Sequence, residues 1–288
     1  MTSTNSTSSK SILTPSSTAD RFSVIEGIVV QIAAIQLQII EDELPVDRLR
    51  RVTEIVRNES DAGADFVVLP EMWLAGFFGF DHYADLAEDL NGPLVKNLAA
   101  LAAECGTYLC AGSIIERDGR DLYNSTVLFG PDGTLVASYR KMHLFGYGSR
   151  EREILSPGQE VVTCELNGVR FGLSTCYDLR FPELYRRQVE MGAEVLLVVA
   201  AWPFPRLDAW RCLVRARAIE NQAVVVACNA AGTQKGSVFA GATRAYGPWG
   251  MLLGELDDRP GVLRCDLDIN TVSAARAEFP ALADRVMG

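Results

Sequence analysis

The sequence of 288 residues carries a formal net charge of −10, with 48% hydrophobic and 22% charged residues. This length and composition predict a globular protein with a sizeable core, and the acidic balance argues against a nucleic-acid partner. The longest apolar run, residues 195–202, is far shorter than the roughly 18 residues of a membrane span, so we expect no membrane partner.

The first segment differs in composition from the rest of the chain. Residues 1–26 are rich in Ser and Thr and contain no apolar stretch. Such a segment is neither a secretory signal nor able to bury enough surface to fold. We therefore expect residues 1–26 to be a disordered tail. No Pro/Gly-rich linker divides the remainder, so residues 27–288 are predicted to form a single domain.

The cysteines and histidines indicate the redox compartment and the chance of a metal site. The seven cysteines are odd in number and no pair has C-x-x-C spacing, which favours a reduced, cytoplasmic protein over a disulfide scaffold. Only two histidines occur, far apart in sequence, and they give little support to zinc. Residues 146–151 lack the third glycine of a dinucleotide-binding loop. We expect neither a metal nor a cofactor.

The first half of the chain alternates strand and helix patterns from about residue 27. Apolar residues alternate with glutamines over 35–39 and predict a strand. Prolines that suit a first helical turn, and glycines that suit a helix end, predict helices over 45–63 and 93–106. Further strands are predicted at 66–69, 108–115, 123–129 and 134–140.

The second half continues the same alternation. Asn167-Gly168 is the strongest short hairpin signal and joins predicted strands at 160–166 and 169–175. Helices are predicted at 182–191 and about 208–221, strands at 195–201 and 223–228, and three more strands within 237–267. Crossover helices together with antiparallel hairpins indicate an α/β protein.

Three polar residues stand at the ends of predicted strands, where α/β folds tend to place reactive groups. Cys176 precedes a turn and a helix whose amides would favour a thiolate. Glu71 lies between apolar residues and Trp73, so its charge is desolvated, as suits a general base. Lys141 could stabilise an oxyanion. Each residue also has a structural alternative: a buried thiol, a solvated carboxylate and a surface ammonium.

The order and context of these residues carry a family resemblance. LPE around Glu71, YRKMHLF around Lys141 and TCYDLRFPELYR around Cys176 resemble the three signature blocks of the nitrilase, or carbon–nitrogen hydrolase, superfamily. Further matches are GSIIE at 112–116, ARAIENQ at 216–222, Asn229 with Gly232, and GPWG at 247–250. The resemblance covers about residues 28–285. It implies a four-layer α-β-β-α sandwich with two mixed sheets, and a homodimer or higher homo-oligomer.

The same resemblance implies a cysteine-dependent amidase that needs no cofactor. Cys176 is then the nucleophile, Glu71 the general base and Lys141 the oxyanion stabiliser. Glu151 matches a second glutamate that orients Lys141 or the leaving ammonia, whereas the nearby Glu153 is interpreted as a surface charge. The thiolate attacks the amide carbon, ammonia leaves, and water cleaves the resulting thioester.

The residues after the cysteine distinguish the branches of the family. C-Y-D-x-R-F-x-E at 176–183 is similar to omega-amidases and deaminated-glutathione amidases, whereas nitrilases proper have Trp-Glu after the cysteine. The resemblance implies a small carboxylate-bearing amide as substrate, with Arg180 binding the carboxylate and the backbone N–H of Tyr177 joining Lys141 at the oxyanion. A structural Arg180–carboxylate pair is the alternative.

Several features leave the substrate and the reaction open. The segment between Lys141 and Glu151 is short, and relatives often have other residues at Ala209 and Thr243-Arg244, so the pocket lining could favour another small acid amide. N-carbamoyl amino acid hydrolase and nitrilase activities remain alternatives. So do an acyltransferase that passes the thioester to an amine and a non-catalytic metabolite-binding protein, although a degenerate binding protein would lose part of the triad.

Overall fold

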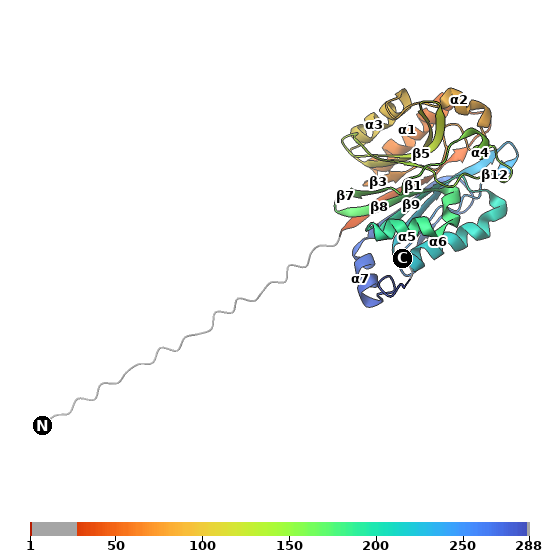
Figure 1. Cartoon of the computed structure of the whole chain (residues 1–288). Coiled ribbons are helices and arrows are strands. Elements are labelled where there is room, and N and C mark those ends of the chain that lie inside the picture. The colour runs from red at the N-terminus through yellow and green to blue at the C-terminus, as the bar shows by residue number, and fades with distance from the viewer. Residues whose placement is uncertain (2–27, 287–288) are drawn as a thin grey trace.

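The computed structural model describes Met1 and residues 28–286, and these residues form four layers (Figure 1). Two six-stranded mixed sheets face each other, and helices cover the outer face of each sheet. The predicted α-β-β-α sandwich is therefore confirmed. The predicted tail, residues 1–26, lies outside the described residues except for Met1, and the domain predicted over 27–288 stays a prediction. No described helix is long and apolar enough to cross a membrane.

The first sheet has the order β15-β1-β3-β4-β5-β6. Its strands are β1 (Val29–Gln36), β3 (Phe66–Val68), β4 (Tyr108–Asp118), β5 (Asp121–Phe129), β6 (Leu135–Arg140) and β15 (Gly261–Asp268). β1, β3 and β4 are parallel to one another, and their crossovers are helices α1 (Pro45–Asp61) and α3 (Pro93–Cys105). Both helices begin at a proline, as predicted, and α3 ends before Gly106, whose φ of 61° suits a helix end.

The second sheet has the order β14-β13-β10-β9-β8-β7. Its strands are β7 (Thr163–Leu166), β8 (Val169–Thr175), β9 (Val195–Ala200), β10 (Val224–Asn229), β13 (Arg244–Tyr246) and β14 (Leu252–Glu255). The predicted hairpin turn at Asn167-Gly168 joins β7 to β8. Helices α5 (Pro182–Glu190) and α6 (Leu207–Asn221) cover the outer face, opposite α1 and α3 (Figure 1).

The remaining elements are short, apart from one terminal helix. A small sheet joins β2 (Gln38–Ile39), β11 (Ala231–Gln234) and β12 (Ser237–Val238). The helices are α2 (Tyr83–Leu86), α4 (Glu151–Ile154) and α7 (Asn270–Glu278). Single 3₁₀ turns occur at Phe80–His82, Cys176–Arg180 and Phe204–Arg206.

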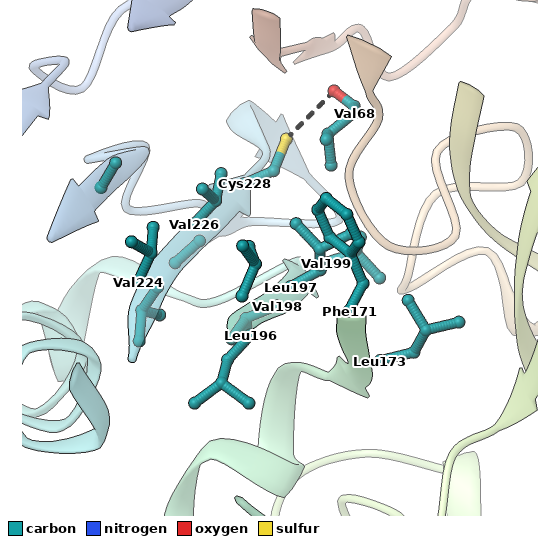
Figure 2. Packing of buried hydrophobic residues seen from close by; sticks show 14 of the residues in the cluster. Val68, Phe171, Leu173, Leu196, Leu197, Val198, Val199, Val224, Val226 and Cys228 are labelled. Atoms are coloured by element: carbon teal, nitrogen blue, oxygen red, sulfur yellow. Dashed lines mark hydrogen bonds between the residues drawn. The ribbon is translucent and has the colours of Figure 1, made fainter. Parts of the chain in front are cut away.

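Side chains from both sheets fill the space between them. Phe66 of the first sheet stacks on Phe171 of the second, with ring centroids 5.3 Å apart. Figure 2 shows apolar side chains of β8, β9 and β10 gathered beside Val68 of β3. The Cys228 thiol donates to the main-chain oxygen of Ile35 at 3.2 Å and to that of Val68 at 3.5 Å, and Figure 2 shows the second of these bonds. The two sheets are thus held by apolar burial and by a thiol that bridges them.

The structure corrects the predicted elements at two places. The strand predicted at 35–39 instead runs over Val29–Gln36 and breaks at Leu37. Gln36 is not a solvent-facing residue of that strand: it is buried, and its amide donates to the main-chain oxygens of Asp257 and Arg259. Residues 237–267 hold four strands where three were expected, because β12 belongs to the small sheet.

Candidate active site

The side chains of Glu71, Lys141 and Glu151 converge in one buried cluster. Lys141 Nζ lies 2.8 Å from Glu71 Oε1 and 2.9 and 3.0 Å from the two carboxylate oxygens of Glu151. None of these side chains is exposed to solvent. Lys141 follows the last residue of β6, Glu71 follows β3 after two residues, and Glu151 is the first residue of α4. The fold therefore brings together residues that the sequence places far apart.

Other donors, which the sequence analysis did not single out, hold the two carboxylates. Asn124 of β5 donates from Nδ2 to Oε1 of Glu71 at 2.8 Å and to Oε1 of Glu151 at 2.9 Å. The main-chain N–H groups of Ala201 and Phe145 donate to Glu71 Oε2 and Glu151 Oε2, at 2.9 and 2.6 Å. Every carboxylate oxygen thus has a donor. The available signal was the polar run Asn124-Ser125-Thr126 inside a predicted strand, since buried polar groups need partners.

Cys176 lies beside this cluster at the start of the turn that follows β8. Its φ is 49°, in the left-handed region that a non-glycine residue adopts at a cost of about 1–2 kcal/mol. Its side chain belongs to the core between the sheets, and the residue is 7% exposed. The strained backbone therefore turns the chain sharply at the point where the thiol meets the pocket described below.

Asp178 fixes this turn to the segment that carries Lys141. Its carboxylate accepts the N–H of Thr175 at 2.9 Å, the hydroxyl of Tyr139 at 2.7 Å and the N–H of His143 at 3.0 Å. Asp178 is wholly buried, so these hydrogen bonds are shielded from water. Residues on both sides of Lys141 are thereby tied to the residues around Cys176.

The charges of the cluster shift the pKa values of its members. Burial opposes the charge of Lys141, but the carboxylates of Glu151 and Glu71 outweigh burial and raise the pKa of Lys141. Burial raises the pKa of Glu151, against the attraction of Lys141.

The thiol of Cys176 is protonated at rest. Burial, and next the carboxylate of Glu71, raise the pKa of Cys176 well above its ordinary value, although Lys141 and the Ala201 amide oppose this. The turn and helix amides were expected to favour a thiolate, and burial together with Glu71 acts in the opposite direction. The Glu71 carboxylate is the charge that does most to raise this pKa, and a carboxylate near the thiol can accept its proton.

A cavity opens onto Cys176. Its walls are mostly aromatic or apolar, and its lining residues are Phe77, Phe78, Phe145, Cys176, Tyr177, Arg180, Ala201, Trp202, Pro203 and Arg206. Tyr177 meets Phe145 edge to face, with centroids 5.2 Å apart. The Arg180 guanidinium lies 5.0 Å from the Trp202 ring centroid. Among residues 28–286 no carboxylate forms an ion pair with Arg180, so the structural pair considered above is not found.

Other residues weighed from the sequence lie away from this cavity. Glu153 is exposed and faces Arg150, as expected for a surface charge. Ala209 and Arg244 were expected to influence the pocket lining, but neither lines the cavity. Arg244 pairs instead with Glu255. Within the part of the chain that the structure describes, no three His, Cys, Asp or Glu side chains gather as they would around a metal ion.

Comparison with known proteins adds to this geometry. A sequence model of the family described as carbon-nitrogen hydrolase matches residues 31–277. A 2-oxoglutaramate amidase of Paenarthrobacter nicotinovorans is 36% identical over 264 residues, which are 89% of each chain. A CN-hydrolase superfamily protein of Xanthomonas campestris, solved with an arsenic adduct in its active site, is 30% identical, with a TM-score of 0.83 over 91% of this chain and 100% of that one.

A third comparison concerns covalent chemistry. A variant of the amidase from Nesterenkonia sp. AN1 is 27% identical to this chain, with a TM-score of 0.79 over 89% of this chain and 94% of that one. Its structure shows the acetamide moiety of fluoroacetamide added covalently at the active-site cysteine of that protein.

Proposed function

The chain belongs to the carbon–nitrogen hydrolase family and hydrolyses amide C–N bonds, and we propose that Cys176 carries out this reaction on a small amide that bears a carboxylate. The observation that carries the proposal is the contact of the Lys141 ammonium with Glu71 and Glu151, beside the thiol and at the base of an aromatic pocket. In that pocket a guanidinium has no acidic partner among the described residues.

In the proposed first half-reaction, Glu71 removes the thiol proton. The Cys176 thiol is neutral at rest, so attack on the amide carbon requires a base within reach, and Glu71 is that base. As the C–S bond forms, the negative charge moves to the amide oxygen, where Lys141 and the Tyr177 N–H stabilise it. Glu71 then passes its proton to the amide nitrogen, the C–N bond breaks, and ammonia leaves behind a thioester.

In the second half-reaction, the carboxylate of Glu71 activates a water molecule. Glu71 takes a proton from water, the resulting hydroxide attacks the thioester, and the proton returns to the sulfur of Cys176 as the acid leaves. Glu151 has a positioning role, because its two oxygens hold the Lys141 ammonium at 2.9 and 3.0 Å. The ammonium is therefore already oriented when charge develops on the substrate oxygen.

We propose that Arg180 binds the carboxylate of the substrate. Its guanidinium lines the cavity, stacks on Trp202 and has no ion-pair partner among the described residues. Relatives named 2-oxoglutaramate amidase support an amide with a carboxylate at its far end. Replacing Arg180 by Lys keeps the charge but removes the planar fork. We expect Arg180→Lys to raise KM for 2-oxoglutaramate and to leave KM for neutral butyramide unchanged.

The central test is ammonia release by the wild type and by Cys176→Ala. The substrates are 2-oxoglutaramate, succinamate, an N-carbamoyl amino acid and a simple nitrile, with product analysis in the presence and absence of an added amine. We expect the wild type to convert the first two to acids, and Cys176→Ala to lose about a thousandfold or more in rate while folding normally. Cys212→Ala is the matched control, because Cys212 is an exposed cysteine. Undiminished activity of Cys176→Ala would contradict the proposal.

We also propose that the enzyme associates with a second copy of itself. Exposed apolar side chains form a patch at one end of the second sheet: Ile219 (46% exposed), Trp249 (50%), Met251 (65%) and Phe279 (58%). The Trp249 and Phe279 rings lie 6.3 Å apart. Such a patch is typical of a protein interface. Sedimentation velocity at micromolar concentration should show a dimer in the wild type and a monomer for Met251→Glu, whereas a monomeric wild type would contradict the proposal.

We place the enzyme in the cytoplasm. All seven cysteines are free in the structure, which suits a reducing compartment. Cell fractionation followed by immunodetection is the test, and recovery of the protein outside the cytoplasmic fraction would contradict it.

A further inference from the structure

The pocket above Cys176 contains a second guanidinium. Arg206 lines the same cavity as Arg180, and its guanidinium lies 5.4 Å from the ring centroids of both Phe145 and Tyr147. The ion pairs among the described residues include none for Arg206, as for Arg180. The cavity is thus bordered by two positive charges that no acidic side chain of residues 28–286 neutralises.

Two unpaired positive charges in this pocket contrast with the acidic composition of the chain and with the apolar lining of the pocket. The chain has 37 acidic against 27 basic residues, so unpaired arginines are not the result of a basic surplus. Most other lining residues are apolar or aromatic, and Arg180 and Arg206 are the charged residues of this lining. Aromatic stacking orients a guanidinium without neutralising it. Both guanidinium groups are therefore held in place with their hydrogen-bond donors available for an anion.

Trp202 links the two arginines structurally. The Arg180 guanidinium stacks on the Trp202 ring at 5.0 Å, and the indole Nε1 donates to the main-chain oxygen of Arg206 at 2.8 Å. Trp202 itself packs against the buried Trp210, and their ring centroids lie 5.5 Å apart. One rigid aromatic pair thus fixes the positions of both residues that carry the pocket's charge.

We propose that Arg206 binds the substrate carboxylate together with Arg180, and that this pair makes the enzyme selective for amides with a terminal carboxylate. A carboxylate has two oxygens that accept about four hydrogen bonds, so it can accept donors from two guanidinium groups at once. This inference rests on the proposed function, because it assigns Arg206 to the same site. It adds a specificity residue outside the segment that follows the cysteine.

The position of Arg206 also gives it a role in substrate entry. Four residues line both the cavity at Cys176 and an adjoining outer cavity: Phe78, Phe145, Pro203 and Arg206. An anion that enters through the outer cavity meets Arg206 before it reaches Cys176. Attraction at this junction raises the rate of productive encounter and weakens as salt screens it.

The test compares an acidic with a neutral amide. We expect Arg206→Met to raise KM for 2-oxoglutaramate about tenfold or more and to reduce the salt dependence of kcat/KM. The value of kcat/KM for butyramide should stay within about twofold of the wild type. Arg206→Lys should recover part of the loss. Arg211→Met is the matched control, since it removes a positive charge that pairs with Glu255 on the surface of α6.

A binding measurement separates this inference from the proposed function. Calorimetry with 2-oxoglutarate on Cys176→Ala, with and without Arg206→Met, reports carboxylate affinity without any catalysis. If the wild type hydrolyses none of the amides, the proposed function fails, yet a loss of 2-oxoglutarate affinity in the Arg206→Met variant still supports the inference. Unchanged affinity and KM would overturn it, as would equal losses for the acidic and the neutral amide.

Discussion

Glu71 and Glu151 share the same two donors, since Oε1 of each carboxylate accepts a hydrogen bond from the Lys141 ammonium and another from the Asn124 amide. The two carboxylates come from different segments and have different proposed roles. Because they share donors, a change at either donor alters the charge balance of both. This coupling determines what each substitution in the cluster should do.

Replacing Asn124 by Leu should move the acid limb of the pH profile. Burial raises the pKa of Glu151, and the hydrogen bond from Asn124 lowers it. Without that hydrogen bond the pKa of Glu151 rises further, so Glu151 is protonated at a higher pH. A protonated Glu151 no longer forms an ion pair with Lys141. We expect the acid limb of kcat/KM to shift to higher pH, measured by ammonia release. Asn97→Leu, an exposed site on α3, is the control, and an unmoved limb in Asn124→Leu would contradict the argument.

Replacing Lys141 by Met should reduce both stability and activity. The variant leaves two buried carboxylates with no cation between them, which costs about 3–5 kcal/mol of unfolding free energy. Adding Glu151→Gln removes one of these charges, so the double variant should recover part of the stability but none of the ammonia release. Denaturant unfolding and activity assays measure the two effects. A Lys141→Met variant as stable as the wild type would show that the cluster is not charged as described.

Replacing Asp178 by Asn should disturb the position of the catalytic residues without affecting substrate binding. An amide oxygen is one acceptor where the Asp178 carboxylate offers two, so at least one hydrogen bond to Thr175, Tyr139 or His143 is lost. We expect kcat to fall while KM for 2-oxoglutaramate changes little, since Asp178 does not line the cavity. Tyr139→Phe removes only one of the hydrogen bonds to Asp178, together with the one that the Met142 N–H donates to the hydroxyl, and should show a smaller loss of the same kind. A rise in KM with unchanged kcat would rule out this role.

Alkaline pH should destabilise the protein in part through Cys110. Burial raises the pKa of this thiol from 9.0 to about 12. The unfolded chain therefore loses the Cys110 proton above pH 9.0 while the folded protein keeps it. The corresponding stability is present below pH 9.0 and is lost as pH rises toward about 12, by about 1.4 kcal/mol per pH unit.

Denaturant unfolding between pH 8 and about 11 measures this loss. The unfolding free energy of Cys110→Ala should decline less steeply with pH than that of the wild type. Cys212→Ala, at an exposed site, should match the wild-type slope. Equal slopes for Cys110→Ala and the wild type would contradict the assignment.

The sequence predicted the parts of the fold that local rules control. Proline at the start of α1 and α3 and Asn167-Gly168 between β7 and β8 act within a few residues, and those elements agree with the structure. The end of β1 could not be predicted this way. Gln36 is buried because main-chain oxygens of the distant Asp257 and Arg259 accept its amide hydrogens. No local pattern contains that tertiary partner.

In the site, too, some residues could be predicted from the sequence and others depend on tertiary contacts. The strand ends and the family resemblance pointed to Glu71, Lys141, Cys176 and Glu151. The sequence did not point to Asn124 or Arg206, which depend on which strand or turn faces the cluster and the pocket. It also did not reveal that burial and the Glu71 carboxylate raise the pKa of Cys176. Desolvation is a property of the folded interior that a linear pattern does not reveal.

The complete burial of Glu71 and Lys141 under a cavity that opens at Cys176 has a kinetic consequence for the proposed mechanism. Ammonia departs, and water arrives, through the space that the acyl chain also occupies. The two small molecules therefore exchange in sequence above the thioester, and the lifetime of the acyl-enzyme depends on how fast that exchange occurs. A bulkier acyl chain would slow this exchange and so lengthen the life of the intermediate.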